Sequence, residues 1–398
     1  MKKNSKSPKT AQYANRIRDI QPSGLRKLFD LEYELLKSSD LKILSFGLGN
    51  LNIPVMPEII EQLKKELNEP ISHSYTSNAG LLELRIAIAD KYLSQYQIDY
   101  NPEQVLVTSG CLEALFDTFL TLVDPNDEVL IPDPAFGYYR NQVRICGGKI
   151  ISLPLNERFE LDCETVNEAI TSKTKILLLN FPCNPTGSVM SRQKMKNVIE
   201  TANDAGILII ADEAYEGLTY ENHRHVSAAE FDQENVLILS SFSKTYCMTG
   251  FRIGYIIGSL DYIKPISLIH QLNTACASTP SQIAAKIALQ SHPSIRTAML
   301  KELSLRRIEV IKAFTSIDGI SLNYNPLGAF YIYPEISGTE MTGKEFSEYA
   351  LNHAKIVVVP GDEFGDITTN NIRVSYGYLS VPEIKEAGFR LKKCLENV

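Results

Sequence analysis

The sequence predicts an α/β fold built on a mostly parallel sheet that helices cover on both faces. Between residues 104 and 258, short apolar runs alternate with helix-like segments such as 112–123 and 191–206. Most of the runs are continuously apolar, which is typical of strands buried on both faces. Their alternation with helices favours parallel pairing. Seven runs are expected to form the sheet: 104–109, 127–132, 149–153, 175–180, 207–212, 236–241 and 253–258.

The length of 398 residues is more than one domain usually holds. Residues 1–45 are expected to form an N-terminal arm with a helix over about 11–40, because leucines recur there at helical spacing. A large domain is expected over 46–288, with further helices at 58–67 and 81–96.

A smaller α+β domain is expected over 289–398, and the N-terminal helix is expected to pack with it. One long helix, bent near Pro293, is predicted to lead into this domain. Strand-like pieces follow at 329–336, 356–360 and 372–378.

Composition and charge argue against several classes of protein. With 40 Lys and Arg against 47 Asp and Glu, the net charge is −7, which argues against a general nucleic-acid binder. No apolar run of about 18 residues predicts a membrane span, and no apolar segment follows the basic N-terminus as in a secretory signal. Seven scattered cysteines without a CxxC pair favour a reduced, cytoplasmic protein. No metal site is predicted, because His223 and His225 lack nearby cysteine partners.

Polar side chains follow several of the predicted strands, at the edge where open α/β sheets bind ligands. Asp212 follows a run of apolar residues, where a carboxylate needs a partner. That partner is either a structural one, as in a helix cap or salt bridge, or a cationic ligand atom. Lys244 follows another run, and Arg252 lies eight residues further on. Such a lysine is a surface residue, an anion binder, or an amine of lowered pKa that forms a Schiff base.

Motifs at two further strand ends each have a functional and a structural interpretation. Ser109 and Gly110 lead into a helix, so they form either a phosphate site at the helix N-terminus or an ordinary cap. Asn184 lies between prolines in 181–187, so it belongs to a rigid turn or presents its amide as a hydrogen-bond donor.

Taken together and in order, these motifs resemble the class I/II aminotransferases, fold-type I enzymes that use pyridoxal 5′-phosphate (PLP). The resemblance covers about residues 44–380 and implies the PLP-dependent transferase fold type I. The motifs that carry it are Asn184-Pro185-Thr186-Gly187, Asp212-Glu213-Ala214-Tyr215, Ser241-Phe242-Ser243-Lys244-Thr245, Thr249-Gly250-Phe251-Arg252-Ile253-Gly254, and Arg373 in an Ile-Arg-Val-Ser string.

The resemblance implies a role for each matching residue. Lys244 is the Schiff-base lysine and the proton shuttle. Asp212 pairs with the protonated pyridine nitrogen and keeps the ring an electron sink. Tyr215 and Asn184 bond the phenolic oxygen of the cofactor. Arg373 clamps the substrate carboxylate, assisted by Asn184 and the backbone of Gly49.

The remaining implied residues bind the cofactor's phosphate and ring. Phe136 stacks on the ring, although it could be plain core. Tyr75 reaches the phosphate of the neighbouring subunit, although it could be structural. The residues implied at the phosphate itself are Gly110, Cys111 and Leu112 through backbone N–H groups, with Ser241, Ser243 and Arg252.

The implied activity is transfer of an amino group from an α-amino acid to a 2-oxo acid by a ping-pong mechanism, in a homodimer. Many bacterial aspartate-specific relatives place a lysine where this chain has Leu112, so an apolar or broad amino donor is the hypothesis for this chain. A PLP-dependent lyase, such as a carbon–sulfur β-lyase or an aminocyclopropane-carboxylate synthase-like enzyme, stays open as the alternative. A non-catalytic member of the fold is disfavoured by the intact motifs, and a dehydrogenase by the lack of a GxGxxG after the first strand.

Overall fold

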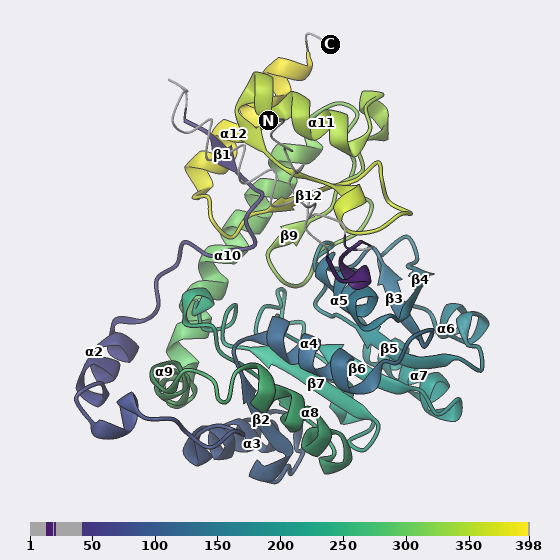
Figure 1. Cartoon of the computed structure of the whole chain (residues 1–398). Coiled ribbons are helices and arrows are strands. Elements are labelled where there is room, and N and C mark those ends of the chain that lie inside the picture. Colours follow the sequence, from purple (N-terminus) through teal and green to yellow (C-terminus); the bar gives the residue numbers. More distant parts are fainter. Residues whose placement is uncertain (1–12, 19, 21–41, 397–398) are drawn as a thin grey trace, which may run out of the picture.

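The computed structural model describes residues 13–18, 20 and 42–396, and its largest sheet holds the seven predicted strands (Figure 1). They are β2 (Val105–Thr108), β3 (Glu128–Asp133), β4 (Lys149–Pro154), β5 (Thr174–Leu179), β6 (Leu208–Asp212), β7 (Val236–Ser241) and β8 (Gly254–Ile257). Their order is β2-β8-β7-β6-β5-β3-β4. In this sheet β8 alone runs opposite to the other six strands, so the prediction of a mostly parallel sheet is confirmed.

The continuous apolar runs are explained by burial of both faces of this sheet. Successive residues of a strand point to opposite faces. In β5, Leu177 and Leu179 belong to one core cluster, whereas Ile176 and Leu178 belong to another on the opposite side. Both faces therefore require apolar residues, and alternation with polar residues is lost.

Helices cover the two faces separately. One face carries α4 (Cys111–Leu122), α5 (Tyr138–Cys146) and α8 (Leu260–Asn273). The other face carries α3 (Leu82–Tyr96), α6 (Cys163–Ala169), α7 (Arg192–Asp204) and α9 (Thr279–Gln290), with α2 (Pro57–Glu66) packed on α9. This arrangement confirms the predicted α/β class.

The C-terminal part of the chain forms a second set of elements around its own core cluster, above the large sheet in Figure 1. Its strands form a parallel pair, β1 (Leu44–Ser45) with β10 (Ile356–Val357), and an antiparallel sheet of β11 (Val359–Pro360), β12 (Ile372–Ser375) and β9 (Tyr331–Ile332). The helices are α10 (His292–Thr315), α11 (Gly343–Tyr349), the π-helical turn η7 (Ala350–Ala354) and α12 (Val381–Leu395).

Short 3-10 helices fill several connections between these elements. They are η1 (Asn15–Ile17), η2 (Pro70–His73), η3 (Pro102–Gln104), η4 (Ala228–Glu230), η5 (Thr249–Phe251), η6 (Ser337–Thr339) and η8 (Gly361–Glu363). Among them, η5 directly precedes Arg252, and η1 lies against α5.

Two local predictions differ from the structure or lie outside it. The single long helix bent near Pro293 is wrong: α9 ends at Gln290, and α10 begins after Ser291 with Pro293 in its first turn, where the missing proline N–H costs nothing. Most of the predicted helix over 11–40 lies outside the described residues, and its described part, 13–18 and 20, contains the short helix η1. The two boundaries between the three expected domains stay a prediction. None of the described helices is long and apolar enough to cross a membrane.

Candidate active site

A cavity of about 460 Å³ lies at the carboxyl ends of the parallel strands. Asp212 is the last residue of β6, Ser241 is the last residue of β7, and Asn180 directly follows β5. Tyr331 of β9 and Arg373 of β12 complete the wall from the C-terminal part of the chain. The cavity therefore lies where sheet topology predicts a ligand site.

Lys244 places its amine inside this cavity. Its Nζ donates a hydrogen bond to the carbonyl oxygen of Gly49 at 2.5 Å. The ring centroids of Tyr215 and Phe330 lie 5.9 and 5.6 Å from the same nitrogen. Burial, together with the positive charges of Arg373 and Arg252, lowers the pKa of Lys244 to about 8. A substantial fraction of the amine is thus neutral, and therefore nucleophilic, near neutral pH.

Asp212 supplies a buried carboxylate to the same cavity. The Tyr139 hydroxyl donates to its Oδ2 at 2.7 Å, and the Ala214 N–H donates to its Oδ1 at 3.1 Å. The Cys111 thiol is a further donor to this carboxyl group. Burial outweighs these donors and raises the pKa of Asp212. A cation bound beside it would lower that pKa again, so the site favours a positively charged ligand atom at Asp212.

Arg373 is almost fully buried and is held by two oxygens. Its guanidinium donates to Asn184 Oδ1 at 3.0 Å and to the Gly47 carbonyl oxygen at 2.5 Å. Its Nε is buried without a hydrogen-bond partner among the described residues. A buried guanidinium with an unmet donor is suited to a carboxylate ligand. Nearby, the hydroxyls of Tyr215 and Tyr331 lie 2.8 Å apart.

The N-terminus of α4 and Arg252 form a cationic end of the cavity. Gly110 caps α4 with a φ of +92°, a backbone conformation that favours glycine, and a Cβ built on it would lie 2.7 Å from Arg252 Nη2. Arg252 Nη2 donates to the Ser109 carbonyl oxygen at 3.4 Å. The first backbone N–H groups of a helix have no partner within the helix, and with the guanidinium they suit a phosphate.

Most of the predicted site residues line this one cavity. Gly110 adjoins it through Arg252, whereas Tyr75 is 87% exposed and does not line it. The predicted residues that line the cavity are Gly49, Cys111, Leu112, Phe136, Asn184, Asp212, Tyr215, Ser241, Ser243, Lys244, Arg252 and Arg373.

Several lining residues were not among the predicted site residues, and three of them, Asn180, Tyr139 and Tyr331, make hydrogen bonds that the sequence did not reveal. Asn180 donates to the Asp212 carbonyl oxygen at 2.9 Å and accepts from the Asn184 N–H at 3.0 Å, so it ties two strand ends together. Its position directly after an apolar run was a usable signal. Tyr139 and Tyr331 gave no such signal, because each meets its partner only through the tertiary fold.

Comparisons with known proteins agree with this geometry. Residues 42–390 match the family model for aminotransferase class I and II. The chain is 36% identical to an aspartate aminotransferase of Pyrococcus horikoshii, covering 96% of this chain and 97% of that protein. It is 33% identical to aromatic-amino-acid aminotransferase 2 of Thermococcus litoralis, over 96% and 98% of the two chains. The solved alanine aminotransferase of Pyrococcus furiosus superimposes with a TM-score of 0.92 at 28% identity, covering 97% and 100%.

The chain belongs to the class I and II aminotransferases and has the fold of the fold-type I enzymes. It is a PLP-dependent aminotransferase, and the lyase alternative is not favoured. The cavity fits that cofactor in three respects. It offers an amine of lowered pKa, a buried carboxylate suited to a cation, and a helix N-terminus with a guanidinium suited to a phosphate.

Proposed function

We propose that Lys244, Asp212 and Tyr215 carry the catalysis of this aminotransferase. When bound, PLP supplies a carbonyl carbon that exchanges amines and a ring that withdraws electrons from the substrate α-carbon. Lys244 would hold the cofactor through its Nζ and, when that amine is free, would carry the proton at the substrate α-carbon. Asp212 would hold the proton on the ring nitrogen, and Tyr215 with Asn184 would donate to the phenolic oxygen. The lowered pKa of the Lys244 amine supports this assignment most strongly.

The other predicted contacts complete the cofactor site. Phe136 would pack against the ring. The backbone N–H groups of the α4 N-terminus, the guanidinium of Arg252 and the serine hydroxyls would donate to the phosphate. The residues proposed at the phosphate are Gly110, Cys111, Leu112, Ser241, Ser243 and Arg252.

We propose that Arg373 binds the substrate α-carboxylate, with the Gly49 backbone and Asn184 beside it. Three cationic side chains line the cavity among the described residues: Lys244, Arg252 and Arg373. Each already has a role, so the described part of the cavity wall offers no further cation for a second carboxylate. The donor class is therefore an apolar or broad range of amino acids. Relatives of similar identity carry aspartate and aromatic names, so likeness alone does not select the donor.

A titration of the purified, PLP-loaded protein with a panel of amino acids tests this proposal. Alanine, methionine and aromatic amino acids are expected to convert the absorbance band of the pyridoxal form into that of the pyridoxamine form. Each conversion should reverse when a 2-oxo acid is added. A strong preference for aspartate over these donors would contradict the proposed donor class. If no amino acid converts the band, the proposed catalytic assignment is wrong.

The lowered pKa of Lys244 predicts how fast the protein without cofactor takes up PLP. Only the neutral amine attacks the carbonyl carbon, so uptake should accelerate about ten-fold between about pH 7 and pH 9, with a midpoint near 8. Stopped-flow absorbance measures this rate. In Arg373→Gln, which removes one neighbouring cation, the midpoint should move upward. A midpoint near 10.5 in the unsubstituted protein would show that the amine is not perturbed.

Leu112→Lys is expected to shift the donor preference toward aspartate. The substitution adds a cation to the cavity wall without removing the backbone N–H of residue 112. A charged hydrogen bond of about 1.5–3 kcal/mol should raise kcat/KM for aspartate relative to alanine by about ten-fold or more. Leu112→Met is the matched control, because it changes shape without charge and should keep the donor order. An unchanged ratio in Leu112→Lys would place the donor side chain elsewhere.

We also propose a cytoplasmic homodimer, with Tyr75 reaching the phosphate of the partner subunit. The exposure of Tyr75 supports a contact outside its own chain, as does that of Leu268 and Leu272, which lie one turn apart on α8 at 62% and 84%. All seven cysteines are free thiols, which supports a reducing compartment. They are Cys111, Cys146, Cys163, Cys183, Cys247, Cys276 and Cys394. Sedimentation velocity should report twice the chain mass of 44.5 kDa.

A further inference from the structure

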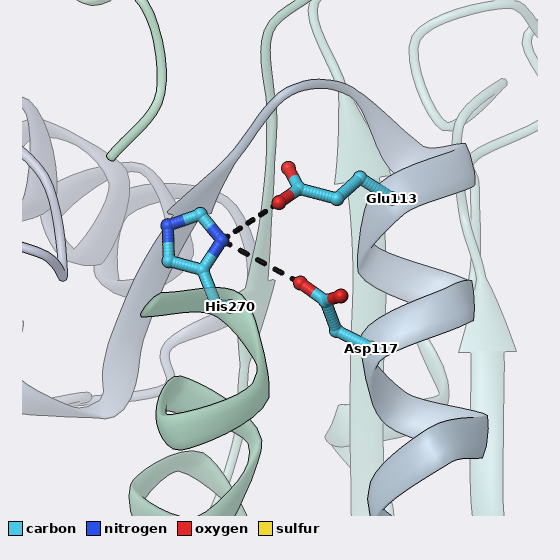
Figure 2. A group of neighbouring side chains, drawn as sticks. All are labelled: Glu113, Asp117 and His270. Carbon is cyan, nitrogen blue, oxygen red and sulfur yellow. Dashed lines mark hydrogen bonds and ion pairs between the residues drawn. The ribbon is translucent and has the colours of Figure 1, made fainter. Parts of the chain in front are cut away.

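A buried ionic cluster joins α8 to the first two turns of α4, outside the cavity. His270 of α8 is fully buried, and its Nδ1 lies 2.8 Å from Glu113 Oε1 and 3.5 Å from Asp117 Oδ2 (Figure 2). Thr274 donates to the same Glu113 oxygen at 2.6 Å, and Asn273 donates to Asp117 Oδ1 at 3.1 Å. The end of α8 thus holds two acidic residues of α4.

The cluster continues into the turn that precedes α4. The second oxygen of Glu113, Oε2, accepts the Ser109 N–H, and the Ser109 carbonyl oxygen accepts from Arg252. A chain of contacts therefore runs from His270 through Glu113 to the Ser109–Gly110 turn. This turn leads directly into the N-terminus of α4, where the phosphate is proposed to bind.

Glu113 poses an electrostatic problem at this position. A carboxylate in the first turn of a helix occupies the end that also attracts a phosphate, so the two anions compete for the same positive potential. Burial opposes the charged form of His270, but the hydrogen bonds to Asp117 and Glu113 prevail and raise its pKa to about 9. Its Nε2 is buried without a hydrogen-bond partner among the described residues. The polar contacts of the ring are therefore those of Nδ1 with the two carboxylates.

We propose that His270 is a positioning residue for the phosphate: it cancels the charge of Glu113 and holds that side chain on the Ser109 N–H. The proposal rests on the proposed placement of the phosphate at the N-terminus of α4. His270 acts through Glu113 and touches neither cofactor nor substrate. When the positive charge of His270 is removed, Glu113 faces the phosphate as an uncompensated anion.

The test uses His270→Asn, because the asparagine amide nitrogen replaces Nδ1 as a donor but carries no charge. Binding of PLP to the protein without cofactor should weaken about ten-fold or more, since one uncompensated charge acts across a low-dielectric region. Binding of pyridoxal, which lacks the phosphate, should change less than about two-fold. Competition by inorganic phosphate should weaken in parallel with PLP. Fluorescence titration measures all three affinities.

A double variant separates charge from packing. In His270→Asn with Glu113→Gln, the carboxylate in the first turn of α4 is removed together with its partner, while Asp117 remains one turn further along the helix. PLP affinity should therefore recover most of the loss. Equal weakening of PLP and pyridoxal, or no recovery in the double variant, would show a merely structural role and overturn the inference. Thermal unfolding of each variant identifies any that fail to fold. In that case Thr274→Val replaces them, because it removes only the hydroxyl that donates to Glu113. This variant should lower PLP affinity more than pyridoxal affinity.

Arg252→Gln tests the underlying placement independently. Loss of PLP and phosphate affinity in Arg252→Gln supports the phosphate site whatever His270 does. If Arg252→Gln leaves both affinities unchanged, the placement of the phosphate is wrong and the inference falls with it. If Arg252→Gln weakens both while His270→Asn weakens neither, only the inference fails.

Discussion

Lys244→Ala is expected to lower the turnover of amino transfer by at least about 10⁴-fold, because it removes the covalent attachment of the cofactor and the proton carrier together. The amine lies 2.5 Å from the Gly49 carbonyl oxygen and has a pKa of about 8. The remaining cavity keeps its phosphate end and its carboxylate, so the variant should still bind PLP without covalent attachment. Steady-state kinetics with saturating donor and 2-oxo acid measure the loss.

Borohydride reduction supplies the second readout for this variant. In the unsubstituted protein, reduction should fix the cofactor to the chain, and mass spectrometry of the digested protein should locate it at Lys244. Lys264→Ala is a matched control, because Lys264 is an exposed lysine of α8 and its removal should change neither turnover nor attachment. Should Lys244→Ala retain a reducible covalent link, another residue holds the cofactor and the proposed site is wrong.

The strands of the large sheet were predictable because their burial is a local property of the sequence. Most of these strands are covered by helices on both faces, so their apolar runs are continuous, and several of the runs end at a polar residue. Asp212 and Ser241 were found this way, since each closes such a run. The chemistry of the site could be inferred because the strand ends of a parallel sheet converge in space.

Contacts across long sequence separations were not predictable from the same signals. Tyr139 meets Asp212 from a helix that begins 74 residues earlier, where Tyr138 is the first residue of α5, and no local pattern marks it as a donor. The contact of His270 with Glu113 joins α8 to α4 in the same way. The break between α9 and α10 was missed because a proline in the first turn of a helix and a proline at a bend look alike in sequence.

The second large effect is expected at Asp212, where the charge of the carboxylate can be removed almost without changing its shape. Asp212→Asn should lower kcat by about 10²–10³-fold, the usual cost of losing one preorganised electrostatic contact at a reacting system. The cofactor should remain attached to Lys244, since that amine is untouched. Loss of turnover with an intact, borohydride-reducible link therefore separates the role of Asp212 from that of Lys244.

Tyr139→Phe provides the graded comparison for Asp212→Asn. It removes the 2.7 Å hydrogen bond to Oδ2 but leaves the carboxylate and its charge. Loss of one neutral donor typically costs about 0.5–1.5 kcal/mol, so kcat should fall by about ten-fold at most. The pKa of Asp212 is already raised by burial, and losing a donor raises it further, so the pH below which activity declines should move upward in Tyr139→Phe. If Asp212→Asn turns over as fast as the unsubstituted enzyme, the carboxylate does not govern the electron demand of the ring, and its burial beside three donors has a structural cause instead.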